Sequence, residues 1–214
     1  MRPTPAELRA LARRDPALGR WLRALPRFPG FPDERNPRQR SHWDALTSAI
    51  VYQQLSTKAA TTIWQRASAL TPGARFPSAM ELLELEDSAL RGAGLSRAKV
   101  AALRDLAERV ASGALPLRSI GRLSDDDVVE RLVEVRGIGE WSAQMFLLFR
   151  LGRLDVFAPG DLGLQEGVRL LDERTERPTP KELEARAETW RPLRSVACWT
   201  LWRLVEHARA NEAR

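Results

Sequence analysis

The chain has 214 residues, of which 43% are hydrophobic, so it is long enough for one large domain or two small lobes with a real core. A single cysteine, Cys198, excludes an internal disulfide and a four-cysteine zinc or iron–sulfur site, and two distant histidines disfavour a histidine metal site. The net charge of +6 and the isoelectric point of about 10.5 suit a polyanionic partner. Without an apolar run of ~20 residues or a signal-peptide core, we expect a cytoplasmic protein that does not span a membrane.

Helix start signals follow one another along the chain. Thr4–Glu7 and Thr179–Glu182 each combine a Thr N-cap, a Pro at the first helical position and a Glu three residues after the cap. Ser96 and Ser124 are predicted caps of two further amphipathic helices, and residues 192–210 form another. No run of alternating polar and apolar residues indicates a strand. The prediction is an all-α fold.

Two glycines interrupt the helical pattern at Gly137 and Gly139, with Ile138 between them. Because glycine costs ~1 kcal/mol in a helix interior, a helix from Ser124 should end before them and a new one should begin near Glu140. We predict a hairpin with left-handed backbone angles at both glycines and an inward-pointing isoleucine.

The bare backbone of this hairpin suits an anion. The first N–H groups of the second helix lack helical partners, and the helix dipole favours negative charge there. We therefore predict a phosphate clamp, with a plain turn between two helices as the alternative.

Asp161 is the candidate for chemistry. It follows Pro159-Gly160 and precedes the helical stretch "LGLQEGVRLL". An N-cap is the simpler interpretation of such an aspartate, and a reactive carboxylate is the other.

The hairpin resembles the helix–hairpin–helix DNA-binding motif, with Arg136 where proline is usual. Together with "AIVYQQLSTKAA" (49–60), "GLSRAKVAALRDLA" (94–107), "DVFAPGD" (155–161) and "WRPLRSVACWTLWRL" (190–204), it makes residues 40–205 similar to helix–hairpin–helix DNA glycosylases, specifically the bacterial 3-methyladenine DNA glycosylase II group. That resemblance implies two helical lobes with an active-site cleft between them. One lobe spans 42–152 and carries the motif at about 124–149; the other combines 1–41 with 153–214. An additional N-terminal α/β domain, found in larger members, is not expected.

By this resemblance Asp161 is the catalytic carboxylate, which stabilises the positive charge that develops on the sugar as the base departs. Members that also cut the strand have a lysine where this chain has Trp141, so we expect base removal without lyase activity. The alternative for Trp141 is a core position. The residues that the resemblance places at the base pocket are Trp141, Trp202, Tyr52, Met145 and Leu162.

The resemblance also assigns DNA contacts. The hairpin contributes Arg136, Gly137, Ile138, Gly139 and Ser142. Gln54 or Leu55 is the wedge that fills the space of the everted base, and the sequence does not choose between them. The alternative is that Gln53 and Gln54 simply end a helix.

No cofactor is required on this reading, and no iron–sulfur cluster is expected. Family members bind Na⁺ or K⁺ through main-chain carbonyls that match Val133, Val135 and Ile138.

The sequence thus favours a monofunctional DNA glycosylase for alkylated purines, acting as a monomer on damaged double-stranded DNA in the nucleoid. One alternative is a non-catalytic helix–hairpin–helix DNA-binding module, against which Asp161 argues. Another is a glycosylase with lyase activity, against which Trp141 argues. Which alkylated or deaminated bases are accepted stays open.

Overall fold

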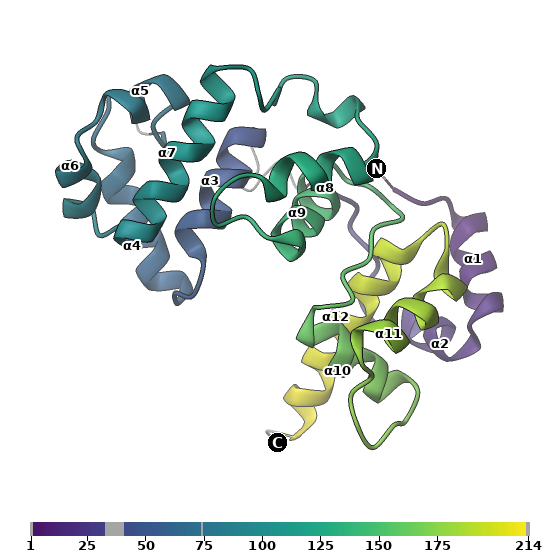
Figure 1. Cartoon of the computed structure of the whole chain (residues 1–214). Helices are drawn as coiled ribbons and strands as arrows, with labels where there is room; N and C mark the ends of the chain where they lie inside the picture. Colours follow the sequence, from purple (N-terminus) through teal and green to yellow (C-terminus); the bar gives the residue numbers. More distant parts are fainter. Residues whose placement is uncertain (1, 33–40, 74, 213–214) are drawn as a thin grey trace. The chain divides into compact units, whose positions relative to one another are not determined.

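The computed structural model describes residues 2–32, 41–73 and 75–212, and within these ranges the chain forms helices and no strand (Figure 1). The all-α prediction is confirmed. No helix of the described residues combines the length and apolarity needed to cross a membrane. The chain divides into two compact units, Asp33–Phe146 and Met1–Pro32 with Leu147–Arg214. The lobe boundaries expected from the sequence are residues 42 and 152.

The Asp33–Phe146 unit is built around α7 (Arg97–Ala111), which packs against α3 (His42–Tyr52) and α5 (Ala79–Glu84). Its buried face carries Leu103 and Leu106, which are fully covered. The remaining helices of this unit are α4 (Thr57–Ser68), α6 (Asp87–Gly92), α8 (Asp125–Val133) and α9 (Glu140–Met145). Helices α8 and α9 pack on each other and carry the predicted hairpin between them.

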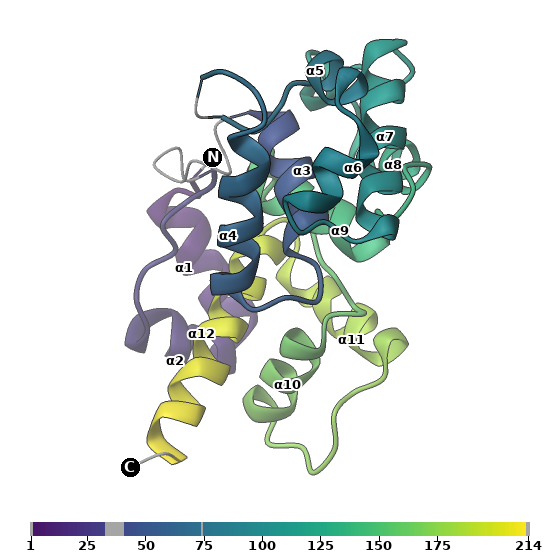
Figure 2. The ribbon, with the colours of Figure 1, turned by 90° about the vertical axis from the view of Figure 1, so that its left-hand side faces the viewer.

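The other unit joins both ends of the chain, as Figures 1 and 2 show by colour. Its helices are α1 (Pro5–Arg14), α2 (Pro16–Ala24), α10 (Leu162–Leu171), α11 (Pro180–Ala187) and α12 (Arg194–Glu212). Helix α12 packs along α10 and also against α2.

The helix expected over 192–210 is present, but its bounds and its amphipathic character differ from the prediction. Helix α12 begins at Arg194, and its first half is buried on most sides. The physical reason is that α12 packs against neighbours on more than one side. A helix in that position needs apolar residues on several faces and not on one stripe.

The predicted caps are confirmed. Thr4 and Thr179 form complete capping boxes with Glu7 and Glu182, and the side chains of Ser96 and Ser124 accept backbone N–H groups at their helix starts.

A buried carboxylate ties α2 to the far end of the sequence. Asp15 caps α2, accepts a hydrogen bond from the Trp190 indole at 2.7 Å and pairs with Arg186 at 2.6 Å. Burial raises the pKa of Asp15, but the hydrogen bonds from Leu18, Trp190 and Arg186 outweigh it, so the net shift is downward. The ends of the chain are therefore held together by an ionised group.

Candidate active site

The hairpin lies between the end of α8 at Val133 and the start of α9 at Glu140. Ile138 is only 4% exposed, and its N–H donates to the Val135 carbonyl at 3.0 Å. The inward position predicted for the isoleucine is confirmed.

The two glycines differ from each other. Gly137 has φ +79, and a Cβ there would lie 3.2 Å from the Ala102 Cβ. Both the backbone angle and the internal packing therefore favour glycine at this position. Gly139 has φ −97, which contradicts the expected left-handed angle; it is the N-cap of α9, a position that takes extended backbone angles. A Cβ at Gly139 would meet nothing within 4 Å. Neither backbone conformation nor internal packing therefore accounts for this glycine.

The start of α9 carries no side-chain cap, because Gly139 has no acceptor to offer its first N–H groups. Beside it Arg136 is exposed, and its backbone N–H is fixed by a 2.7 Å hydrogen bond to Asp105 Oδ2. Ser142 is half-buried in the first turn of α9. The hairpin thus presents backbone donors and a guanidinium on one short stretch of chain.

A second loop is tied to this hairpin. The Gln53 side chain donates its amide to the Gly137 carbonyl at 2.9 Å, and Lys99 Nζ donates to the carbonyls of Val51 at 2.6 Å and Gln53 at 2.9 Å. Sequence reasoning missed Lys99, although it stands in the quoted stretch 94–107. Burial lowers the pKa of Lys99.

The two wedge candidates, Gln54 and Leu55, come directly after Gln53 in the chain. Helix α3 ends at Tyr52 with Gln53 as its C-cap, so Gln54 and Leu55 stand outside the helix. Gln54 has φ +55, and the side chain of Leu55 is 40% exposed. Exposure leaves both residues as candidates. The Tyr52 hydroxyl is hydrogen-bonded to Thr61 at 3.0 Å.

The segment leading to Asp161 is fastened to the start of α12. Arg194 pairs with Asp155 at 2.9 Å, and Ser195 receives the Val156 N–H and donates to the Arg153 carbonyl. These contacts join the segment 153–156 to the first turn of α12. The Asp161 N–H closes a turn onto the Ala158 carbonyl at 3.0 Å.

Asp161 caps α10 and also meets α12. Its Oδ1 accepts the Leu164 N–H at 2.8 Å and the indole N–H of Trp202 at 3.1 Å. The N-cap interpretation is therefore confirmed. A capping carboxylate is a fixed carboxylate, so this interpretation is compatible with a reactive role.

An aromatic ring and a buried thiol lie beside this pair. Phe149 stacks on Trp202 with ring centroids 5.6 Å apart and planes inclined by 19°. Burial raises the pKa of the Cys198 thiol far above its ordinary range, and the negative charge of Asp161 raises it further. Cys198 is therefore a neutral, inert neighbour.

The predicted base-pocket residues fall in both units. Trp141, Tyr52 and Met145 belong to the Asp33–Phe146 unit, whereas Trp202 and Leu162 belong with Asp161. Trp141 is 50% exposed, which excludes the alternative of a core tryptophan, and Leu162 is 65% exposed. Met145 and Tyr52 are half-buried.

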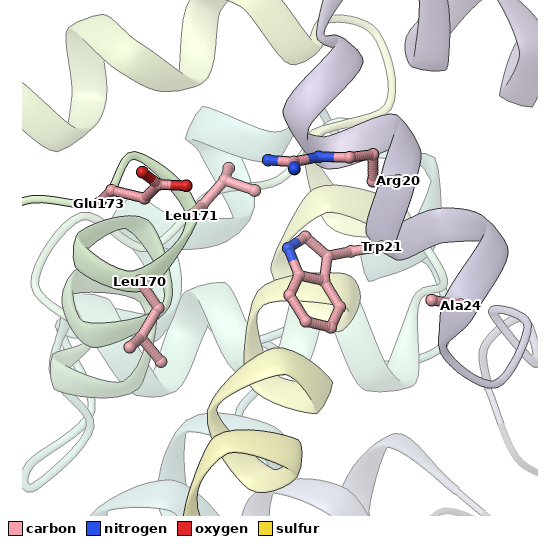
Figure 3. Close-up of a pocket in the computed structure, with 6 residues that line it drawn as sticks. All are labelled: Arg20, Trp21, Ala24, Leu170, Leu171 and Glu173. Carbon is pink, nitrogen blue, oxygen red and sulfur yellow. The ribbon is translucent and has the colours of Figure 1, made fainter.

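A pocket of about 220 Å³ lies at the opposite end of α10 from Asp161 (Figure 3). Arg20, Trp21 and Ala24 of α2 line it from one side, and Leu170, Leu171 and Glu173 at the end of α10 line it from the other. None of its residues was predicted as a site residue.

Comparison with known proteins identifies the family of this chain. The family described as HhH-GPD superfamily base excision DNA repair protein matches residues 47–192, more than half of the chain. The chain belongs to the HhH-GPD superfamily. It is 31% identical to DNA-3-methyladenine glycosylase 1 of Schizosaccharomyces pombe, over 86% of this chain and 81% of that protein.

Solved HhH-GPD structures agree with the fold. A DNA-3-methyladenine glycosidase from Bacillus halodurans superposes with a TM-score of 0.82 at 36% identity, covering 94% of this chain and 91% of its own. The S. pombe 3-methyladenine DNA glycosylase Mag1, in complex with abasic DNA, gives a TM-score of 0.79 at 29% identity and covers 92% and 95%.

Proposed function

We propose that this protein is a DNA glycosylase that hydrolyses the N-glycosidic bond of alkylated purines, of the 3-methyladenine type, in base excision repair. The observation that carries the proposal is Asp161, a carboxylate held by donors from α10 and α12, in an HhH-GPD chain similar to 3-methyladenine glycosylases. A module that only bound DNA would need no more than an N-cap at this position, and Ser, Thr or Asn would serve for that as well as Asp.

Asp161 acts through its charge. As the bond between C1′ and the base lengthens, the sugar becomes oxocarbenium-like, and a fixed carboxylate beside it stabilises that charge. Because two hydrogen bonds hold Oδ1, the carboxylate need not reorganise during the reaction. The same group orients the water that attacks C1′. An alkylated purine already carries positive charge, so its departure needs little help from an acid.

Base eversion requires a side chain that fills the space left in the duplex and a pocket that binds the everted base. Gln54 or Leu55, both exposed on the loop after α3, fills the space left in the duplex. The half-exposed ring of Trp141 offers an aromatic face to the cationic base.

Strand cleavage is not part of the reaction. A lyase needs an amine that forms a Schiff base with the sugar. The chain has three lysines, Lys58, Lys99 and Lys181, and Lys99 is engaged with the carbonyls at the end of α3. Trp141 takes the place that a lysine occupies in lyase members.

The hairpin holds the DNA backbone. Its bare backbone at Gly139 accepts a phosphate against the first N–H groups of α9. Main-chain carbonyls of Val133, Val135 and Ile138 would be the ligands of a Na⁺ or K⁺ ion. Val133 ends α8, where the last carbonyls lack helical partners, and the Val135 carbonyl, which accepts the Ile138 N–H, has a second lone pair. Such an ion would add positive charge beside the phosphate.

Single-turnover release of methylated bases from duplex DNA tests the proposal. Asp161→Asn keeps an acceptor for the Leu164 N–H but removes the charge, so we expect base release to slow by at least ~10²-fold. DNA affinity should remain, because the hairpin is untouched.

Alkali treatment after the reaction separates the alternatives. Abasic sites that break only in alkali support a monofunctional glycosylase, and strand breaks before alkali contradict it. Wild-type protein that binds duplex DNA but releases no alkylated base would indicate a DNA-binding module instead.

A further inference from the structure

The contact between Asp161 and Trp202 depends on a residue that has no side chain. A Cβ built on Gly163 would lie 3.0 Å from Asp161 Oδ1, 3.1 Å from Trp202 Cδ1 and 3.2 Å from Trp202 Nε1. Gly163 does not have a left-handed backbone angle, so its conformation does not demand glycine. The space that it leaves empty is the space through which the indole reaches the carboxylate.

One turn further along α10, Gly167 faces α12 in the same way. A Cβ there would lie 2.7 Å from the Leu201 Cβ and 3.1 Å from the Leu201 carbonyl oxygen. The two glycines therefore let α10 and α12 approach closely, but only Gly163 stands beside the carboxylate.

We propose that Gly163 is a positioning residue for Asp161, and that it acts through Trp202. Without a methyl group at 163, the indole N–H donates to Oδ1 and fixes the carboxylate from the side of α12, while the Leu164 N–H fixes it from α10. Stacking on Phe149 restrains the plane of the indole. This inference rests on the proposed function and names the groups that hold its reactive carboxylate.

The test compares three variants in single-turnover base release at saturating protein. Gly163→Ala should slow release by about 10- to 100-fold, the cost of a misplacement of about 1 Å, with the Kd for DNA within about twofold of wild type. Trp202→Phe keeps an aromatic ring but removes the N–H, and it should slow release similarly. Gly167→Ala is the matched control: it lowers the melting temperature by at least as much as Gly163→Ala, with a smaller effect on the rate.

The combined variant decides the mechanism. If Gly163 acts through the indole, Gly163→Ala adds little to Trp202→Phe. Losses that multiply would overturn the proposal, and so would a wild-type rate in Gly163→Ala. Should Gly163→Ala fail to fold, a wild-type rate in Trp202→Phe overturns it equally. A wild-type protein that releases no alkylated base would instead refute the proposed function.

An independent observation concerns where the positive charge lies. Residues 2–32 contain seven arginines and two acidic residues, a net charge of +5 out of +6 for the chain. Residues 33–146, which include the hairpin, contain 15 basic and 15 acidic residues and are neutral.

Four arginines of α1 and α2 are available for a partner, whereas the guanidinium of Arg14 donates to the Arg191 carbonyl. Arg9, Arg13, Arg20 and Arg23 are exposed, and none of the four pairs with a carboxylate of the described residues. Arg20 lines the pocket at the C-terminal end of α10 (Figure 3), whereas Asp161 caps the other end. Ten residues of helix span about 15 Å, which corresponds to roughly four base pairs of duplex.

We infer that Arg20 and Arg23 bind phosphates of the DNA duplex a few base pairs from the lesion. Their guanidinium groups match phosphate oxygens, and the distance along α10 places them beyond the nucleotide that Asp161 would serve. This inference also rests on the proposed function.

Duplex length provides the test. Binding is measured for two duplexes with a central abasic-site analogue, one that extends about 3 base pairs to either side of it and one of about 24 base pairs, over a range of salt. Arg20→Gln with Arg23→Gln should lower the slope of log K against log salt by about 2 on the long duplex and leave the short one unchanged. Arg91→Gln with Arg122→Gln removes equal charge from exposed positions of the other unit and serves as control. An unchanged slope on the long duplex would overturn the inference, while base release by wild type tests the function separately.

Discussion

Gly137 and Gly139 stand two residues apart, yet alanine at each should have opposite consequences. At Gly137 an alanine would be forced to φ +79, which costs about 1–2 kcal/mol, and its methyl would press on Ala102. For a chain of this size that corresponds to a melting temperature lower by roughly 2–8 °C. At Gly139 the backbone is ordinary and the space is open, so stability should fall by less than about 1 kcal/mol.

In DNA affinity, Gly139→Ala should lose more than Gly137→Ala, the opposite of their order in stability. A methyl group at Gly139 would stand between a phosphate and the first N–H groups of α9, and we expect Kd to rise about tenfold, or about 1.4 kcal/mol. Thermal melts and fluorescence anisotropy on a duplex with an abasic-site analogue measure both effects. Unchanged affinity in Gly139→Ala would refute the assignment of this glycine to a phosphate.

Three further predictions concern stability and the loop. Asp15→Asn breaks a buried ionic contact and presents an amide to the Trp190 indole, so urea unfolding should show a loss of about 3 kcal/mol. Lys99→Met leaves two carbonyls at the end of α3 without their donor; it should cost about 1–3 kcal/mol and weaken DNA binding through the attached loop. Hydrogen bonds, first from Arg169, lower the pKa of Glu166 from 4.5 to about 2. Its stabilising contribution is therefore complete above pH 4.5 and lost as pH falls toward 2, so Glu166→Gln should melt with a weaker dependence on pH in that range than wild type.

The elements were predictable because their signals are local. A Thr or Ser cap followed by proline or acidic residues determines where a helix begins regardless of its neighbours, and Thr4, Ser124 and Thr179 all cap as predicted. Helix α12 was misjudged because its burial depends on what packs around it, which no periodicity within 192–210 encodes.

The site was predictable only in part. Asp161 and the hairpin stand in recognisable patterns, but the partners that hold them come from distant segments. Lys99 reaches carbonyls 46 and 48 residues away, and Trp202 reaches Asp161 across 41 residues. Those pairings depend on tertiary structure. The left-handed angle predicted for Gly139 was wrong, because glycine is compatible with several backbone angles and its presence in a turn does not determine which one it adopts.

Gly160, next to Asp161, is a second glycine of the candidate site for which neither backbone angle nor packing gives an internal reason. It sits in the turn closed by the Asp161 N–H, has no left-handed angle, and a Cβ there would meet nothing within 4 Å. Alanine should leave the fold intact or stabilise it by about 0.4–1 kcal/mol, because the unfolded chain loses freedom. If DNA approaches the backbone next to Asp161, Gly160→Ala should nevertheless slow base release or weaken binding by about tenfold. Gly92, equally open but at the end of α6, is the matched control and should change neither. A stable, fully active Gly160→Ala would show that open space around a glycine does not mark the DNA-facing surface of this protein.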